Sequence, residues 1–197
     1  MRLFSWMYAE SPPWTRHQVA EDTGDRAFAC AFRELASGRR SAGLEQLYRL
    51  CARDLYGLAL WRTGNSADAE DVVQEVFVKL SRAGKKLARV RHGRRYLLTM
   101  THRTAIDRVR RRRRDEPPTD ELLQPVVERP ERRLDAQRLS AWLVELPPAQ
   151  REAVYLRIYQ DLSFAEVGRI TGVPTFTAAS RYRLAVQRLR RRMEAEA

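Results

Sequence analysis

The sequence predicts an all-α protein of two small helical domains joined by a flexible linker. Apolar residues recur at helical spacing in two blocks, no segment alternates polar and apolar residues over a strand's length, and an acidic segment with several prolines separates the blocks. With 197 residues, 44% of them hydrophobic, the chain can bury one or two small cores. We expect domains at 26–114 and 134–197, a linker at 115–133 and a flexible extension at 1–25.

The first block predicts a long helix that runs from Leu44 to Gly64-Asn65, followed by a helix that Ser66 caps. Acidic residues in the first turn of this second helix suit its N-terminus. Its buried stripe is expected to be Val72, Val73, Val76, Phe77 and Leu80. The residues left facing outward are Asp71, Gln74, Glu75 and Val78. Such a negative, partly apolar face on a basic protein indicates a protein partner, although a solvated face is equally compatible with the pattern.

A third helix is expected from about Arg94 to Arg113, in a segment whose excess of positive charge equals the net charge of the whole chain. The formal net charge is +12, and thirteen Lys and Arg residues between 85 and 114 stand against the single Asp107. Tyr96 and several hydroxyl side chains are interleaved with these cations, which favours binding to single-stranded or unstacked nucleic acid. If about six phosphates are neutralised, the log-log salt dependence of binding has a slope of roughly −5. The alternative is a solvated basic segment.

The second block predicts a helix-turn-helix. Leu139, Trp142, Leu143 and Leu146 indicate an amphipathic helix that ends at Pro147-Pro148, and Pro148 suits the first turn of the next one. Ser163 and Glu166 form a capping box that begins a short helix, and Gly172 marks the turn after it. A final helix begins at Thr175. The spacing is typical of a motif that places its second helix in the DNA major groove; an ordinary helical hairpin is the alternative.

Several classes of protein are disfavoured by the sequence. Cys30 and Cys51 form neither a disulfide framework nor a zinc motif, which fits a cytoplasmic protein. The three histidines lack partners at triad-like positions, and there is no phosphate-binding glycine loop, so we expect no enzyme, no cofactor and no metal. No apolar run is long enough to span a bilayer, and we expect no membrane insertion.

Two strings of residues resemble one family. Residues 67–77, ADAEDVVQEVF, with 96–100 and 105–111 after them, resemble region 2 of the extracytoplasmic-function sigma factors of bacterial RNA polymerase. Residues 146–152, 162–167 and the helix through Ser180-Arg181 are similar to region 4 of the same family. The two blocks come in the family's order and cover roughly residues 36–192.

The resemblance implies a promoter-specificity subunit that binds core RNA polymerase, directs transcription initiation and helps melt promoter DNA. Its implied partners are the clamp helices of the largest polymerase subunit, the flap of the second largest, promoter DNA both duplex and single-stranded, and an anti-sigma factor. The implied polymerase-binding residues are Asp71, Val72, Val73, Gln74, Glu75 and Val78. The implied minus-ten DNA-binding residues are Arg91, Arg95, Tyr96, Thr99, Arg103, Arg108, Arg110, Arg111 and Arg112. The implied minus-thirty-five residues are Thr175, Thr177, Ala178, Ser180, Arg181, Arg183 and Arg188.

The chain departs from the family's usual pattern at some of these positions. Tyr96 stands where most members have Trp, and Arg103 where Asn is common; Ala179 and Leu184 replace a frequent Lys and Arg. The base preferences of the family therefore do not transfer directly. Two other functions remain open at this point, a free-standing helix-turn-helix regulator that works without polymerase and a nucleic-acid-processing enzyme.

Overall fold

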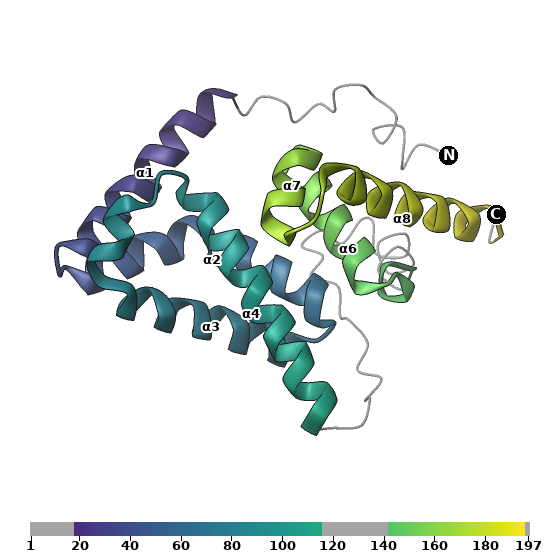
Figure 1. Cartoon of the computed structure of the whole chain (residues 1–197), viewed down its shortest axis with the longest axis horizontal. Helices are drawn as coiled ribbons and strands as arrows, with labels where there is room; N and C mark the ends of the chain where they lie inside the picture. The colour runs from purple at the N-terminus through teal and green to yellow at the C-terminus, as the bar shows by residue number, and fades with distance from the viewer. Residues whose placement is uncertain (1–17, 116–141, 196–197) are drawn as a thin grey trace, which may run out of the picture.

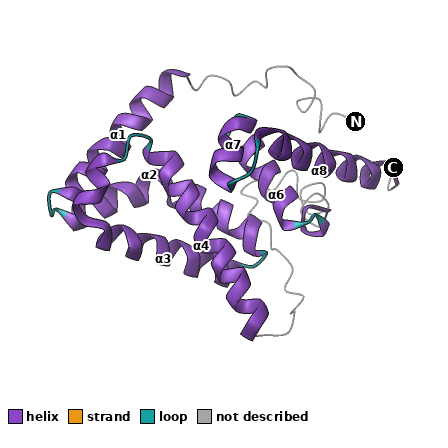
Figure 2. Cartoon of the chain, viewed as in Figure 1, coloured by secondary structure: helices purple, strands orange, loops and turns teal. Residues whose placement is uncertain are grey.

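The structure is a computed structural model that describes residues 18–115 and 142–195. Every regular element in these two ranges is helical, as Figure 2 shows, which confirms the all-α prediction. The elements are α1 (Gln18–Ala36), α2 (Arg40–Thr63), α3 (Ser66–Ala83), the 3-10 helix η2 (Gly84–Arg89), α4 (Gly93–Asp115), α6 (Pro148–Val154), the π-helical turn η4 (Tyr155–Tyr159), α7 (Phe164–Thr171) and α8 (Thr175–Ala195). None of the described helices is both long and apolar enough to cross a membrane.

Helices α1 to α4 form the first unit, on the left of Figure 1. Gly64 ends α2 as predicted, since its φ of 88° lies in the left-handed region. The cap of α3 differs from the prediction by one residue. Asn65, not Ser66, is the N-cap, and its side chain accepts a hydrogen bond from the backbone N–H of Asp68. Asn and Ser are equally good caps, so local preference alone did not decide between them.

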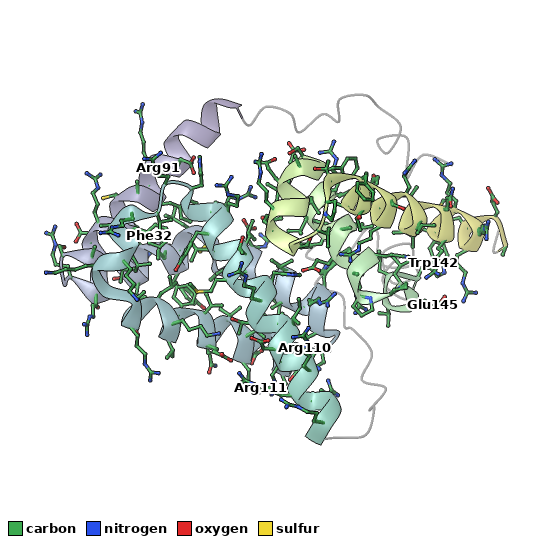
Figure 3. The ribbon with its side chains drawn as sticks, viewed as in Figure 1. Phe32, Arg91, Arg110, Arg111, Trp142 and Glu145 are labelled. Carbon is green, nitrogen blue, oxygen red and sulfur yellow. The ribbon has the colours of Figure 1, made fainter. Side chains whose placement is uncertain are left out.

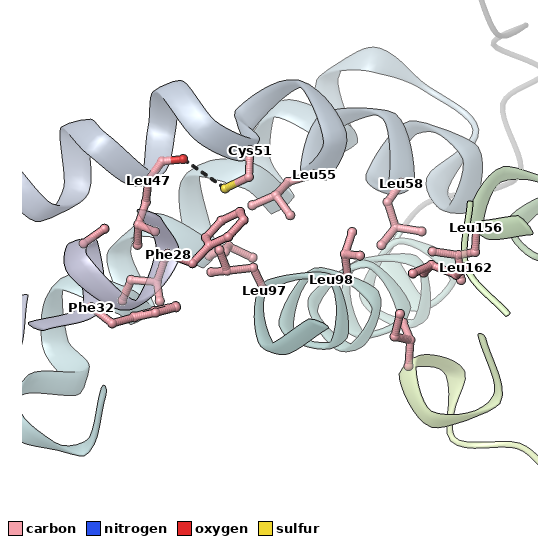
Figure 4. Close-up of a cluster of buried hydrophobic side chains, with 14 of the residues drawn as sticks. Phe28, Phe32, Leu47, Cys51, Leu55, Leu58, Leu97, Leu98, Leu156 and Leu162 are labelled. Carbon is pink, nitrogen blue, oxygen red and sulfur yellow. Dashed lines mark hydrogen bonds between the residues drawn. The ribbon is translucent and has the colours of Figure 1, made fainter. Parts of the chain in front are cut away.

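The core of this unit is a continuous cluster of apolar side chains contributed by all four helices (Figure 4). Phe28 and Phe32 of α1 pack against Leu47 and Leu55 of α2 and against Leu97 of α4. Helix α1 begins at Gln18, so it reaches into the segment 1–25 for which we expected a flexible extension. The remaining residues of that extension, 1–17, and almost all of the predicted linker 115–133 lie outside the described residues.

The second unit, on the right of Figure 1, contains the predicted helix-turn-helix, made of α7 and α8. The capping box is present, with Ser163 accepting from the backbone N–H of Glu166 and the Glu166 carboxylate accepting from the backbone N–H of Ser163. Gly172 adopts a left-handed φ of 71° at the turn. Gly168 lies so close to the turn that a Cβ there would come within 2.6 Å of the Val173 carbonyl oxygen. The two glycines therefore allow the turn to adopt its left-handed backbone and to pack closely against α7.

The two units pack directly against each other, which the sequence did not predict. Leu156 and Leu162 of the second unit join the same apolar cluster as Leu58 and Leu98 of the first (Figure 4). At Gly57 of α2 an added Cβ would lie 2.2 Å from the Tyr155 hydroxyl oxygen. Only a residue without a side chain allows this approach.

Polar contacts reinforce the same interface. Arg151 donates from Nε to the Trp61 carbonyl oxygen at 2.6 Å, and burial together with the charge of Arg62 lowers the pKa of Arg151 to about 10. His102 Nδ1 lies 2.5 Å from a carboxylate oxygen of Glu152, and both side chains are buried. These pairs join α2 and α4 to α6 across 50 or more residues of sequence.

Candidate nucleic-acid interface

Helix α3 presents the acidic face that the sequence predicts. Asp71, Gln74 and Val78 are exposed, while Glu75 and Val73 are half-buried. The cap at Asn65 and the apolar stripe of α3 fix the rotation of this face, since the same stripe packs on α2 and α4. Val72, the remaining residue of the implied polymerase-binding set, has only 1% of its surface exposed. It therefore belongs to the core, as its place in the predicted buried stripe indicates, and not to the outward face.

Helix α4 carries the basic residues along its whole length. Figure 3 shows Arg91 just before its start and Arg110 and Arg111 near its far end. Arg91, Arg103, Arg110 and Arg111 are exposed. The half-buried members of the predicted minus-ten set are Arg95, Tyr96, Thr99, Arg108 and Arg112.

The half-buried Tyr96 and Thr99 of α4 have neutral partners inside the unit. The Tyr96 ring meets Phe32 edge to face, with ring centroids 5.9 Å apart. The Thr99 hydroxyl donates to the Arg95 carbonyl oxygen one turn back at 2.8 Å. Tyr96 therefore has one side anchored to the core, which holds its ring in a fixed position.

The acidic and basic faces are joined by ion pairs. Arg108 donates from Nε to the buried Asp68 at 2.6 Å and lies 2.7 Å from Asp71, while Arg112 lies 3.1 Å from Asp68. Burial alone would raise the pKa of the Asp68 carboxyl, but hydrogen bonds from Arg108, Asn65 and Arg112 hold that pKa below its usual range. Sequence reasoning assigned Asp68 to helix-terminus electrostatics and missed this cluster, because nothing local indicates that α4 lies over the start of α3.

Helix α8 exposes a polar and basic face opposite its packing stripe. Thr175, Arg183 and Arg188 are exposed, and the half-buried members of the predicted set are Thr177, Ser180 and Arg181. Ala178 is buried at 1% exposure within the stripe that packs on the rest of the unit, so it cannot reach a base. Phe176, which was not among the predicted residues, has 74% of its surface exposed. Its position two residues before Ala178 already places it away from the packing face.

Beside the C-terminal half of α8 the structure has a groove of about 230 Å³. Trp142 and Glu145, labelled in Figure 3, form one wall, and Leu189 and the arginines of α8 form the other. Glu145 and Arg192, which both line the groove, form an ion pair. The groove combines apolar and charged walls, as protein-binding surfaces often do.

The cysteines and acidic residues do not form a metal site within the described residues, where no group of three or more His, Cys, Asp or Glu side chains comes together. Cys30 and Cys51 are unbridged. Burial, with the nearby charge of Asp54, raises the pKa of the Cys51 thiol to about 12, and its Sγ donates to the Leu47 carbonyl oxygen. Cys51 is therefore an inert core residue.

Comparison with known families assigns both units. Residues 47–115 match the family model of sigma-70 region 2, and residues 142–191 match that of sigma-70 region 4. The ECF RNA polymerase sigma factor SigE of Mycolicibacterium smegmatis is 33% identical over 195 residues, an alignment that covers 94% of this chain and 70% of the relative. The chain belongs to the ECF sigma factors of RNA polymerase. It is a promoter-specificity subunit that acts in transcription initiation.

Other relatives of this sigma factor have lower identity. SigV of Bacillus subtilis is 28% identical, with 70% of this chain and 83% of the relative covered, and SigK of Mycobacterium tuberculosis is 26% identical, with 78% and 87% covered. The solved structure of the sigma factor RpoE bound to the anti-sigma factor NepR from Bartonella quintana aligns with a TM-score of 0.65 at 22% identity, covering 78% of this chain and 98% of that one. The structure of CnrH with the cytosolic domain of CnrY aligns at 0.63 and 22% identity, covering 87% and 99%. Both likenesses support the two-unit helical fold.

Proposed function

We propose that this sigma factor docks on the clamp helices of the largest polymerase subunit through the outward face of α3. The docking residues are Asp71, Val73, Gln74, Glu75 and Val78. Exposed carboxylate and amide groups around a small apolar centre suit a protein partner, and the half-burial of Glu75 and Val73 keeps their side chains in place before binding. Val72 is omitted from this face because it is buried. This exposed face, within the matched region 2, is the observation that carries the proposal.

On the DNA side, α4 is proposed to hold the melted minus-ten element. Arg91, Arg103, Arg110 and Arg111 provide exposed positive charge along the helix for the phosphates of one strand. Tyr96 offers a partly exposed ring next to Thr99, a combination that can stack on an unpaired base and hydrogen-bond beside it. Bases held in this way offset the few kcal/mol lost for each unstacked step.

The helix α8 is proposed to enter the major groove of the minus-thirty-five element. The exposed Thr175 and the half-buried Ser180 carry hydroxyl groups near its first turns, and arginines follow further along, an order that suits base contacts followed by phosphate contacts. The groove beside Trp142 and Glu145 is the place we propose for the flap of the second largest polymerase subunit. The linker 115–133 would connect the two DNA-reading units.

Three broader proposals follow from family membership. The sigma factor is cytoplasmic and has no catalytic activity or cofactor of its own, so the polymerase performs the chemistry. It is also held by an anti-sigma factor in the resting cell, since both solved neighbours are described in complexes with another protein and one of those partners is an anti-sigma factor. Purification from the native cell with polymerase as the sole partner would contradict this last proposal.

The test is transcription by core polymerase on a library of promoter fragments, with and without the sigma factor. We expect new start sites that depend on the protein and disappear with the double variant Gln74→Ala, Glu75→Ala. The matched control is Glu45→Ala, Gln46→Ala, which removes the same two residue types from α2 and leaves initiation unchanged. If the protein never joins core polymerase but still shifts duplex DNA, a free-standing regulator replaces this proposal.

A further inference from the structure

The recognition helix α8 exposes two large apolar side chains. Phe176 is 74% exposed and Leu184 46%, and Phe176 has the most exposed side chain among the large hydrophobic residues in the described ranges. An exposed phenylalanine contributes almost nothing to folding, because its ring stays in water in the folded state. A partner that covered this ring would therefore gain its whole apolar area on binding.

The two side chains belong to one ridge of the helix. Phe176, Ser180 and Leu184 follow one another at intervals of four residues, so they lie in a row along one side of α8. The buried residues Ala178 and Ala185 lie on the other side and hold the helix against its unit. The ridge therefore faces away from the protein, and it begins in the first turn, where recognition helices approach base edges.

The chemistry of the ridge restricts what it can recognise. Neither Phe176 nor Leu184 has a donor or an acceptor, so neither can read the hydrogen-bonding groups of a base. On the major-groove edges of the four base pairs, the only apolar group is the C5-methyl of thymine. Between Phe176 and Leu184, the Ser180 hydroxyl can form a hydrogen bond with a donor or an acceptor on a neighbouring base edge.

The charge around the ridge favours DNA over an apolar protein surface. Arg183 is exposed and adjacent to Leu184, Arg188 is exposed one turn further on, and Arg181 follows Ser180. Cations on both sides of a narrow apolar row match two phosphate backbones on either side of a groove floor.

We propose that Phe176 and Leu184 read thymine C5-methyl groups in the duplex element bound by α8. The proposal rests on the proposed function, in which α8 enters the major groove of the upstream promoter element, and it names the base chemistry recognised there. The element should contain two thymine-bearing base pairs, one for each side chain, separated by the polar contact of Ser180.

The test replaces thymine by deoxyuridine, which removes the methyl group and nothing else. The upstream element is first identified with wild-type sigma factor and core polymerase, and each thymine is then replaced in turn. We expect about a four-fold loss of affinity at one position for each side chain, the value of one buried methyl group. Phe176→Ala should abolish the thymine preference at one position, and Leu184→Ala should abolish it at another.

Arg183→Ala is the matched comparison on the same helix, because Arg183 is exposed beside Leu184 and lies outside the groove proposed for the flap. Loss of a phosphate contact should weaken thymine and deoxyuridine duplexes equally and make binding less sensitive to salt. Thermal unfolding of Phe176→Ala should match that of the wild type, because the ring is not packed, so any loss of binding reflects recognition and not folding.

The outcomes separate the inference from the proposed function. Initiation by the wild type with no thymine preference at any position would overturn the inference and leave the proposed function intact. Loss of assembly with core polymerase in Phe176→Ala, with an unchanged thymine preference, would assign the ridge to a protein partner instead. Absence of any wild-type binding or initiation at duplex promoters would overturn both.

Discussion

At the scale of single residues, Asp68 takes part both in the N-cap of α3 and in the contact between α3 and α4. Its carboxylate accepts hydrogen bonds from Asn65 at 2.7 Å and from Arg108 at 2.6 Å, and Arg112 lies close to the same group. We expect Asp68→Asn to lower the free energy of unfolding by about 2 kcal/mol, because it removes the buried carboxylate that Arg108 and Arg112 share, while Arg108 keeps its ion pair with Asp71. Urea denaturation at pH 7 measures this difference. The exposed Asp107→Asn, which removes one negative charge from α4, should change stability by less than about 0.5 kcal/mol.

The same residue predicts a dependence of stability on pH. A carboxyl whose folded-state pKa lies below its unfolded value stabilises the fold at pH above the unfolded value, near 4, and this stabilisation is lost as the pH falls through the folded-state pKa. The stability gap between wild type and Asp68→Asn should therefore be full at neutral pH and shrink below about pH 4. A gap of equal size at pH 7 and at pH 3 would mean that the cap geometry, not the charge, carries the effect.

At the scale of helices, the cap of α3 offers a direct test. Asn65 bonds the backbone N–H of Asp68, whereas Ser66 is exposed at the first helical position. Asn65→Ala should lower the free energy of unfolding by about 1 kcal/mol, the usual value of a cap, with faster amide exchange in the first turn of α3. Ser66→Ala should be neutral, since alanine is a good helix former. If Ser66→Ala is instead the more destabilising variant, Ser66 is the cap, as the sequence predicts.

The same helices show what the sequence could and could not predict. Pro148, the Ser163 capping box and Gly172 were predicted correctly because each acts within a few residues of itself. The sequence did not predict the π-helical turn at Tyr155–Tyr159. This turn places two tyrosines against Trp61 of the other unit, and a contact between residues so far apart in the sequence leaves no local pattern.

Among the candidate site residues, the family resemblance placed Val72 and Ala178 on functional faces, but both are buried, as the helical spacing of the sequence predicts for Val72. Phe176 was absent from the predicted set, although its place two residues before Ala178 puts it opposite the packing face, and the structure shows how exposed it is. The pairing of Arg108 with Asp68 spans 40 residues and leaves no local pattern in one sequence.

At the scale of the whole molecule, the two units are packed together through α2 and α6. Gly57 lies directly against Tyr155, whose ring packs against Trp61 and Tyr159, with ring centroids 5.4 and 5.5 Å away. A methyl group at position 57 therefore has no room, and the ring cannot move aside easily. The Tyr155 hydroxyl also donates to the Asp54 carbonyl oxygen at 3.0 Å, a bond that any displacement would break.

We expect Gly57→Ala to separate the units without unfolding either one. Small-angle scattering should show a larger radius of gyration, while circular dichroism should show the same helix content. Gly43→Ala is the matched control, because its Cβ would meet the Ala31 carbonyl oxygen at 2.8 Å inside the first unit. That variant should lower the melting temperature with no change in dimensions. If Gly57→Ala is as compact as the wild type and merely less stable, the contact at Gly57 supports folding but does not hold the units together.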